Sequence, residues 1–539
     1  MMDTPKSPAT GVASRCPLPS LVPTDPDFWP TGGYWRGSVW LPTAYMAIKA
    51  IDGCGDTALA RNLARALLRH MDATYRDFEP HTIWECYSPT EAKPGTYAKR
   101  PGYSRPDFCG WSALGPISIF IEDVIGVKRA DTFANRLVCD FPAEPVGRIG
   151  VRNYRFGDVV CDIVATKDEI SVTSNRPFTL VADGREIAVQ AGENRFARTA
   201  APCPDGRIEF GQNERPSVAD GWRALLPRPV FDECPEWIAL YDKAWELAHA
   251  HIVEVPGLPA PRYMDCGHRS DRIWIWDTCF MALFCKYAPQ EFPGVESLEN
   301  FYKLILEGGD APLPKVLGNR WCGDGEGKML DFMVHIADNP PLFAWVELEY
   351  ALQTGDRARL EKVYLEHRWL QRWFDLFDSF DPAAPRPHGV SAPVTLKRVP
   401  GGYRWSGGAC GLDNTARGRA GDGPSPGADI CTMRPDLLWL DAIAQQGLSA
   451  LCLSRIAALL GRDGEAGSWH AKWTAIRDET NALYWDEADG LYYDIRESDH
   501  SKARVPTIAS FWPLLAEMPT PDMAQRLLAK LNDPFAFGC

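Results

Sequence analysis

The sequence predicts a mainly α-helical protein with a small β domain inserted into it. Amphipathic patterns with a helical period recur along most of the 539 residues. Residues 148–199 differ, because they alternate apolar with polar side chains and are rich in β-branched residues. The chain also contains 20 tryptophans, which indicates an aromatic interior.

About twelve segments have a helical period, and several begin with an Asp, Ser or Pro start signal. Asp356, for example, directly precedes one of them. The intervening loops are rich in Gly, Pro and Trp. The predicted helices cover residues 38–51, 56–71, 112–126, 236–252, 273–287, 294–308, 340–353, 357–379, 435–461, 466–483, 507–517 and 521–532.

The strand signals gather in one region. Residues 170–173, 178–181 and 186–189 are predicted strands, and Asp183-Gly184 is a hairpin signal between the last two. Residues 200–235 contain several prolines and no helical period, which indicates a surface linker. The predicted division is a helical part in residues 1–137 and 236–539, a β domain in residues 138–200 and a linker in residues 201–235.

Charge and composition exclude several function classes. The formal net charge is −14 and Lys and Arg form no stripe, so nucleic acid and membrane partners are disfavoured. We find neither a membrane-spanning apolar run nor the apolar core of a signal peptide. The 16 cysteines lack metal-ligand spacing and often adjoin apolar residues. They predict buried free thiols, no metal or other cofactor, and a cytoplasmic location.

The aromatic residues favour a saccharide partner. The apolar face of a pyranose stacks on an aromatic ring, while its hydroxyls need polar partners at the edge. Tryptophans that only fill a large core are the alternative, and composition does not separate the two explanations.

Four polar segments are rich in glycine and aromatic residues: 32–37, 82–89 with 108–112 downstream, 273–278 and 403–414. Three of them place a carboxylate, Glu85, Asp277 or Asp413, near a tryptophan. Hydrolysis of a glycosidic bond needs one protonated carboxyl group for the leaving oxygen and one ionised group for water. A single pair of this kind is usually a helix cap or a surface carboxylate, so the signal lies in the joint occurrence.

Together these segments resemble a clan of inverting α-glycosidases that holds glycoside hydrolase family 63, the trehalases and the mannosylglycerate and glucosylglycerate hydrolases. Residues 276–278 (WDT) are similar to the clan's WDT motif, and residues 408–417 (GACGLDNTAR) to its SGMDNSPR motif. Residues 34–40 (YWRGSVW) are similar to YWRGPVW, and residues 85–89 (ECYSP) to E-x-Y-x-P. Residues 338–341 (DNPP) resemble a polar-Pro-Pro segment of the family.

The resemblance implies an (α/α)6 toroid, in which about twelve helices surround a Trp-lined centre. It also implies Asp413 as the general acid and Glu85 as the general base, and we expect the Tyr87 hydroxyl to help keep Glu85 ionised. Two departures concern the loop that carries Asp413: Thr415-Ala416 stands where the family has prolines, and Cys410 replaces a more usual neighbour. The expected sugar contacts are Trp276, Asp277, Trp35, Arg36 and Trp405, with Trp84, Trp111 and Asn339 as further candidates.

The order of the motifs differs from that of the clan, in which the acid precedes the base. Here Glu85 comes first, and residues 531–539 resemble the segment that normally leads into residues 17–36. We interpret this order as a circular permutation; a rearranged gene would give the same pattern. Permutation is tolerated where new termini fall in exposed loops.

The sequence therefore predicts an inverting, exo-acting glycoside hydrolase for an α-linked gluco- or manno-configured oligosaccharide or small glycoside. A rhamnosidase-like hydrolase on a similar toroid is one alternative. A non-catalytic sugar-binding protein derived from a hydrolase is the other.

Overall fold

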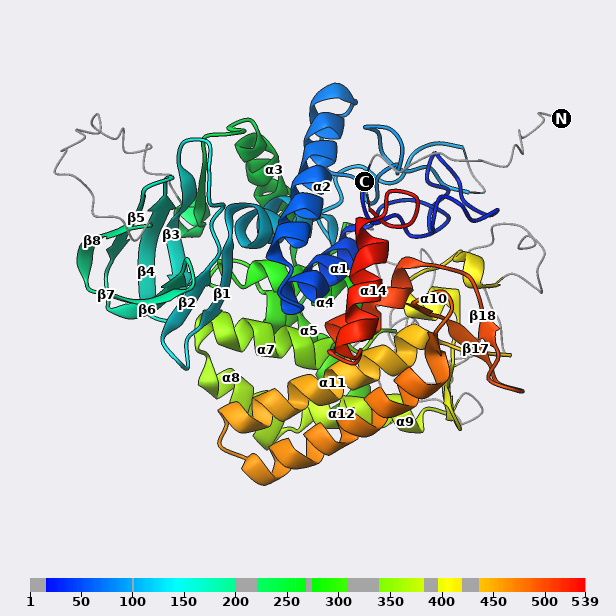
Figure 1. Ribbon diagram of the computed structural model, residues 1–539. Helices are drawn as coiled ribbons and strands as arrows, with labels where there is room; N and C mark the ends of the chain where they lie inside the picture. The colour runs from blue at the N-terminus through cyan, green and yellow to red at the C-terminus, as the bar shows by residue number, and fades with distance from the viewer. Residues whose placement is uncertain are drawn as a thin grey trace.

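The computed structural model comprises a helical body with two packed β-sheets at one side of it (Figure 1). The structure describes residues 16–98, 101–198, 221–256, 258–267, 274–307, 339–381, 396–418 and 436–538. Helices dominate these residues, which confirms the prediction of a mainly α protein with a β insert.

Most predicted helical segments correspond to a helix in the structure. Their starts follow local signals: Asp56 caps the second helix by accepting a hydrogen bond from the Leu59 amide at 3.1 Å, and Thr520 caps the last. The helices are α1 (Leu41–Gly53), α2 (Thr57–Asp77), α3 (Trp237–Ala250), α4 (Ile275–Cys285), α5 (Gly294–Phe301), α7 (Phe343–Thr354), α8 (Arg357–Glu361), α9 (Trp369–Ser379), α10 (Gly407–Cys410), α11 (Leu440–Leu459), α12 (Asp463–Tyr484), α13 (Trp512–Leu515) and α14 (Pro521–Asn532).

Two predicted helices are irregular. The single helix predicted over residues 357–379 is wrong, because α8 continues into a π-helical turn, Lys362–Glu366, and the chain then breaks at Arg368. Arg368 has a φ of 52°, a left-handed conformation that interrupts the helical hydrogen bonds before α9. The segment predicted at residues 112–126 is a 3₁₀ turn, Ser112–Leu114, followed by a π-helix, η2 (Gly115–Ile125).

The β region consists of two sheets with strand orders β8-β5-β4-β3-β9 and β1-β2-β6-β7. All pairs are antiparallel except β2 with β6. Asp183 and Gly184 both have positive φ angles, 49° and 70°, as a type I′ turn between β6 and β7 requires. The strands are β1 (Val127–Asp131), β2 (Arg136–Cys139), β3 (Ile149–Phe156), β4 (Val159–Ala165), β5 (Glu169–Ser174), β6 (Phe178–Ala182), β7 (Arg185–Val189), β8 (Gly192–Ala197) and β9 (Arg228–Phe231).

These sheets extend beyond the predicted range of residues 138–200. Strand β1 lies in the predicted helical part and β9 in the predicted linker. The chain turns from η2 into β1 at Gly126, whose φ is 98° and where a Cβ atom would lie 2.0 Å from the Asp140 carbonyl oxygen. A short strand that directly follows a helix has too few residues to show the alternation of apolar and polar side chains by which a strand is predicted. Residues 201–220 of the predicted linker lie outside the described residues.

The two ends of the described chain lie side by side. The Leu18 amide donates a hydrogen bond to the Phe537 carbonyl at 2.8 Å, and the Ile508 amide donates to the Ser20 carbonyl at 3.1 Å. Helix α1 also packs against α13. Segments from opposite ends of the sequence therefore build one continuous part of the helical body.

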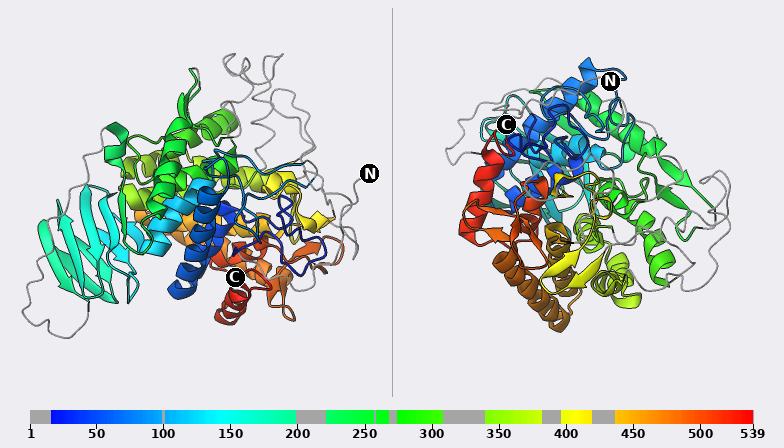
Figure 2. Two further views of the ribbon diagram at one scale, coloured as in Figure 1. Left: turned by 90° about the horizontal axis from the view of Figure 1, so that it is seen from above. Right: turned by 90° about the vertical axis from the view of Figure 1, so that its right-hand side faces the viewer.

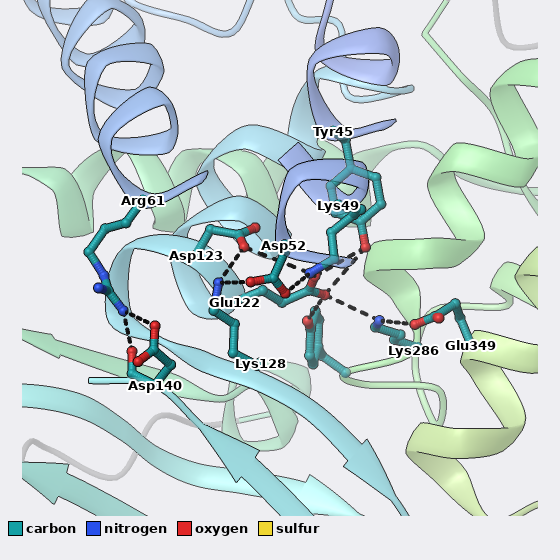
Figure 3. A network of polar contacts seen from close by, with 11 residues as sticks. Tyr45, Lys49, Asp52, Arg61, Glu122, Asp123, Lys128, Asp140, Lys286 and Glu349 are labelled. Atoms are coloured by element: carbon teal, nitrogen blue, oxygen red, sulfur yellow. Dashed lines mark hydrogen bonds and ion pairs between the residues drawn. The ribbon is translucent and has the colours of Figure 1, made fainter. Parts of the chain in front are cut away.

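A buried cluster of charges joins α1, η2 and the end of α4 (Figure 3). Lys49 Nζ lies 2.8 Å from Glu122 Oε2, and Lys286 Nζ lies 3.2 Å from Glu122 Oε1. Burial alone would raise the pKa of Glu122, but the charges of Lys286 and Lys49 outweigh it and lower the pKa to about 2. Lys128 joins the cluster through Asp123, 2.8 Å away, and so ties β1 to η2.

The interior also explains two features of the composition. The described cysteines are unbridged, and all of them except Cys54 and Cys234 are buried, as the sequence predicts for those residues. Helix α11 is the one helix of the described ranges long and apolar enough to cross a membrane, but most of it is packed inside the protein. Such burial is typical of a core helix.

Candidate active site

The loop that carries Asp413 is shaped by two glycines. Ser406 caps α10, and its Oγ accepts a hydrogen bond from the Ala409 amide at 3.3 Å. A Cβ atom at Gly407 would lie 2.4 Å from the Asp413 carbonyl oxygen. Gly411 has a φ of 86°, and a Cβ there would lie 3.0 Å from the Trp276 ring. The glycines therefore let the loop fold back on itself and bring it against the first turn of α4.

The environment of Asp413 favours its protonated form. The residue is only partly exposed, and among the described residues none donates a hydrogen bond to its carboxyl group. Burial, followed by the negative charges of Glu85 and Asp277, raises its pKa from 3.8 to about 8. At neutral pH this carboxyl group can therefore act as a proton donor.

Glu85 lies among hydrogen-bond donors. It is buried, and three donors contact its carboxylate: the Tyr34 hydroxyl at 3.0 Å on Oε1, and the Tyr97 hydroxyl at 2.9 Å and the Arg105 amide at 3.3 Å on Oε2. The indole N–H of Trp111 donates to the Glu85 carbonyl oxygen at 2.8 Å, which fixes the main chain.

The segment 33–36 is hydrogen-bonded directly to the residue after Asp413. The Trp35 amide donates to Asn414 Oδ1 at 2.8 Å, and Asn414 Nδ2 donates to the Gly33 carbonyl at 3.1 Å. Arg36 Nε donates to the Asn414 carbonyl at 2.5 Å. Residues separated by about 380 positions are thus parts of one polar constellation.

The predicted sugar contacts divide into two groups. The first group adjoins the loop that carries Asp413, and its members are Trp276, Trp35, Arg36, Asp277 and Asn339. Asp277 acts through its charge on Asp413, and Asn339 donates a 3.0 Å hydrogen bond to the Ala409 carbonyl. Trp111 adjoins Glu85. The Trp405 ring contacts Phe377 in the core at 5.6 Å, and the Trp84 ring contacts the partly buried Phe78 at 5.6 Å. Their part in sugar binding stays a prediction.

The predicted role of Tyr87 is wrong in this structure. Its hydroxyl accepts a hydrogen bond from the Trp84 amide at 3.2 Å, because the chain turns back between these residues. Tyr34 and Tyr97 contact Glu85 instead. Tyr34 belongs to a motif that the sequence marks, whereas Tyr97 lies in a loop with no recognisable pattern.

A second buried network adjoins the loop that carries Asp413. Arg417 forms a two-point ion pair with Asp441, with N–O distances of 3.1 and 2.7 Å, and its guanidinium lies over the Trp439 ring. Its Nη1 also lies 3.3 Å from Asp494, whose pKa burial and Asp441 raise to about 6 in spite of Arg417. Cys410 fits this arrangement, since its sulfur accepts a hydrogen bond from Arg417. Within the described ranges, no group of three His, Cys, Asp or Glu side chains could hold a metal ion.

Comparisons with known proteins give one family and a small set of distant relatives. Residues 6–107 and 443–539 match the mannosylglycerate hydrolase MGH1-like glycoside hydrolase domain. The first match contains Trp35, Arg36 and Glu85, whereas Asp277 and Asp413 lie outside both. An uncharacterized protein of Borreliella burgdorferi is 22% identical over 265 residues. That match spans 48% of this chain and 46% of the relative, so the chain corresponds to less than half of that protein.

Among solved structures, an uncharacterized conserved protein of Thermus thermophilus is 17% identical with a TM-score of 0.35. It covers 54% of this chain and 74% of its own. The GH63 mannosylglycerate hydrolase of that organism, in complex with glucose, is 16% identical with the same coverage and TM-score. The same enzyme in complex with Tris and D-glycerate has a TM-score of 0.34 and covers 54% of this chain and 76% of its own.

The matched segments hold the motifs at residues 34–40 and 85–89, and the structure brings the Asp413 loop against the first of them. Over residues 6–107 and 443–539 the chain is therefore similar to the mannosylglycerate hydrolase MGH1-like glycoside hydrolase domain.

Proposed function

We propose that this protein is an inverting, exo-acting hydrolase of α-linked gluco- or manno-configured oligosaccharides or small glycosides, with Asp413 as acid and Glu85 as base. The observation that carries the proposal is the contrast between the two carboxyl groups. Burial and neighbouring charges raise the pKa of Asp413 to about 8, while Glu85 receives three hydrogen bonds. Inverting hydrolysis needs one carboxyl group that donates a proton and a second that accepts one.

In the proposed reaction, Asp413 gives its proton to the glycosidic oxygen as the bond to the anomeric carbon breaks. Glu85 takes a proton from the water that attacks the opposite face of that carbon, and the product therefore has the inverted configuration. The water needs a carboxyl separation of roughly 6.5–9.5 Å. Asp413 then regains a proton and Glu85 loses one before the next turnover.

The architecture supports the same proposal. Helices from both ends of the chain lie beside those of its middle in the right-hand view of Figure 2, as expected of an (α/α)6 toroid. The contact between Leu18 and Phe537 is what a circularly permuted toroid requires, since its former neighbours stay adjacent. Trp35 and Trp276 both adjoin the loop that carries Asp413, and we propose a dead-ended pocket there, which would select exo action on small ligands.

The test is a panel of nitrophenyl glycosides and disaccharides with NMR detection of the first anomer released. We expect turnover of a gluco- or manno-configured α-glycoside with release of the β-anomer. Hydrolysis of rhamnosides alone, retention of configuration or cleavage inside a long glucan would contradict the proposal.

The residue roles are tested by Asp413→Asn and Glu85→Gln. A good leaving group needs little protonation, so it should partly rescue Asp413→Asn but leave Glu85→Gln inactive. Glu91→Gln is the control, because Glu91 is exposed and follows the same motif. Reversed rescue would swap the roles. Losses below about tenfold in both variants, against the ~10²–10⁴-fold expected of acid–base groups, would remove them.

A further inference from the structure

We infer that Asn414 is a positioning residue that links the acid loop to the base and sets the separation between them. This inference rests on the proposed roles of Asp413 and Glu85. Asn414 is only 2% exposed, and its side-chain amide uses its oxygen and its nitrogen on one short piece of main chain. It accepts from the Trp35 amide at 2.8 Å and donates to the Gly33 carbonyl at 3.1 Å.

The residue between these two hydrogen bonds is Tyr34. Its φ of 62° is a left-handed conformation that is unfavourable for a non-glycine residue, so it persists only where neighbouring contacts enforce it. The Asn414 amide holds the main chain on both sides of Tyr34. Arg36 adds a third contact, because its Nε donates to the Asn414 carbonyl.

The conformation of Tyr34 directs its side chain to the base. Its hydroxyl lies 3.0 Å from Glu85 Oε1, and its ring packs edge-on against Trp40 at 4.7 Å. A short path therefore runs from the acid, through the Asp413–Asn414 peptide and two hydrogen bonds, to the Tyr34 side chain and the base. The charge of Asp413 also contributes to the raised pKa of Tyr34, after burial and Glu85.

Tyr97 provides an internal comparison. It binds the other oxygen of Glu85 at 2.9 Å, but it comes from a different loop and makes no hydrogen bond with Asn414 in the described structure. Its ring contacts that of Tyr34, with centroids 5.3 Å apart. A Phe substitution at either position keeps this ring contact and removes only the hydroxyl.

This pattern predicts which residues are coupled. If Asn414 acts on Glu85 through Tyr34, then removing the Tyr34 hydroxyl removes most of what Asn414 contributes. Tyr97 acts on Glu85 independently, so its loss should add to the loss of Asn414. Contacting residues in one network are expected to be non-additive, and independent ones additive.

The experiment is a pair of double-mutant cycles measured as kcat on an activated glycoside. We expect Asn414→Ala and Tyr34→Phe each to lower kcat by about 10–100-fold with little change in KM, since small misplacements of catalytic groups have effects of this size. The double variant should be about as slow as the slower single variant. Asn414→Ala combined with Tyr97→Phe should show the product of the two separate losses.

Asn414→Asp is the second variant, and unfolding temperatures are measured for all of them. It keeps the size of the side chain and the acceptor for the Trp35 amide, but it cannot donate to Gly33. When Asn414→Asp is combined with Tyr34→Phe, we again expect a non-multiplicative loss of kcat, with the double variant about as slow as the slower single variant.

Multiplicative losses in both cycles would overturn the inference, while a large loss of activity in Asp413→Asn and Glu85→Gln on a substrate with a poor leaving group would leave the proposed function intact. If those two variants kept their activity, the proposed function itself would fail, and the role of Asn414 with it.

Discussion

Raising the pH should ionise Asp413, the proposed acid, and so stop it donating a proton. This ionisation should occur in a pH range where few aspartates titrate. The pKa of Asp413 is raised from 3.8 to about 8 by burial and by the charges of Glu85 and Asp277. At pH 7 about ten molecules in eleven then carry the proton, whereas an aspartate with its ordinary pKa would carry it in about one of 1,600. Because the protonated form is active, kcat/KM should be constant near pH 7, half-maximal near pH 8 and about tenfold lower for each further unit.

A substitution tests the cause of this shift. Asp277→Asn removes one of the two negative charges that raise the pKa of Asp413, so the basic limb should move to lower pH. Asp277 is also a predicted sugar contact, and its loss should lower activity at every pH. The position of the limb is separable from that loss. Asp522→Asn, an exposed substitution in α14, is the control and should leave the limb in place.

The assay is kcat/KM between pH 5 and pH 10, with circular dichroism at each pH to confirm folding. A substrate with a poor leaving group should show the full limb, and one with a good leaving group a weaker limb. A profile that stays flat above pH 9 with the poor leaving group would refute the assignment of Asp413. An unchanged limb in Asp277→Asn would refute the electrostatic explanation.

Three further predictions concern the surrounding structure. Glu122→Gln leaves Lys49 and Lys286 without their shared partner, so thermal unfolding should show a loss of about 3–5 kcal/mol that the exposed control Glu144→Gln does not show. Because the pKa of Glu122 is lowered from 4.5 to about 2, the stabilisation by this ion-pair cluster is fully present above pH 4.5 and is lost as the pH falls toward 2. Urea titrations that show no such decline in the free energy of unfolding would contradict this prediction. Gly411→Ala should lower kcat, because it strains a left-handed turn against Trp276. Gly464→Ala has open space around it in α12, so it should leave kcat unchanged and be neutral or stabilising in thermal unfolding. Arg417→Lys keeps the charge but loses the two-point pairing with Asp441, so kcat should fall. The control variant Arg526→Lys, at the surface, should keep the kcat of the unmodified protein. Equal kcat values in the two variants would show that the pairing with Asp441 does not support the loop that carries Asp413.

The sequence predicts the long regular elements well because their signals are local and repeated. Helix α2, for example, combines an Asp cap with several turns of apolar period. The break at Arg368 is not predictable in this way, since the apolar period continues across it. Strand β9 is missed for a different reason: its place in a sheet depends on β3, far away in the sequence.

The candidate site is predictable to the extent that short motifs carry it. Glu85 and Asp413 stand in such motifs, and the structure brings the charge of Glu85 to bear on Asp413. Tyr97 is not predictable, because its contact with Glu85 comes from the fold of a loop that has no pattern of its own. The expectation for Tyr87 assumed that nearness in sequence gives nearness of side chains, and a turn of the chain directs its hydroxyl to Trp84 instead.

The contacts that join the acid and base segments are all non-covalent. Asn414 reaches Gly33 and Trp35 through hydrogen bonds between residues about 380 positions apart, and Tyr34 then reaches Glu85. Such a site depends on how the two segments pack and not on which of them is synthesised first. A permuted order of motifs is therefore compatible with the same chemistry, as long as the old neighbours remain in contact. Under the proposed permutation, the hydrogen bond between Leu18 and Phe537 would keep former neighbours together and place the first helix, α1, after α14.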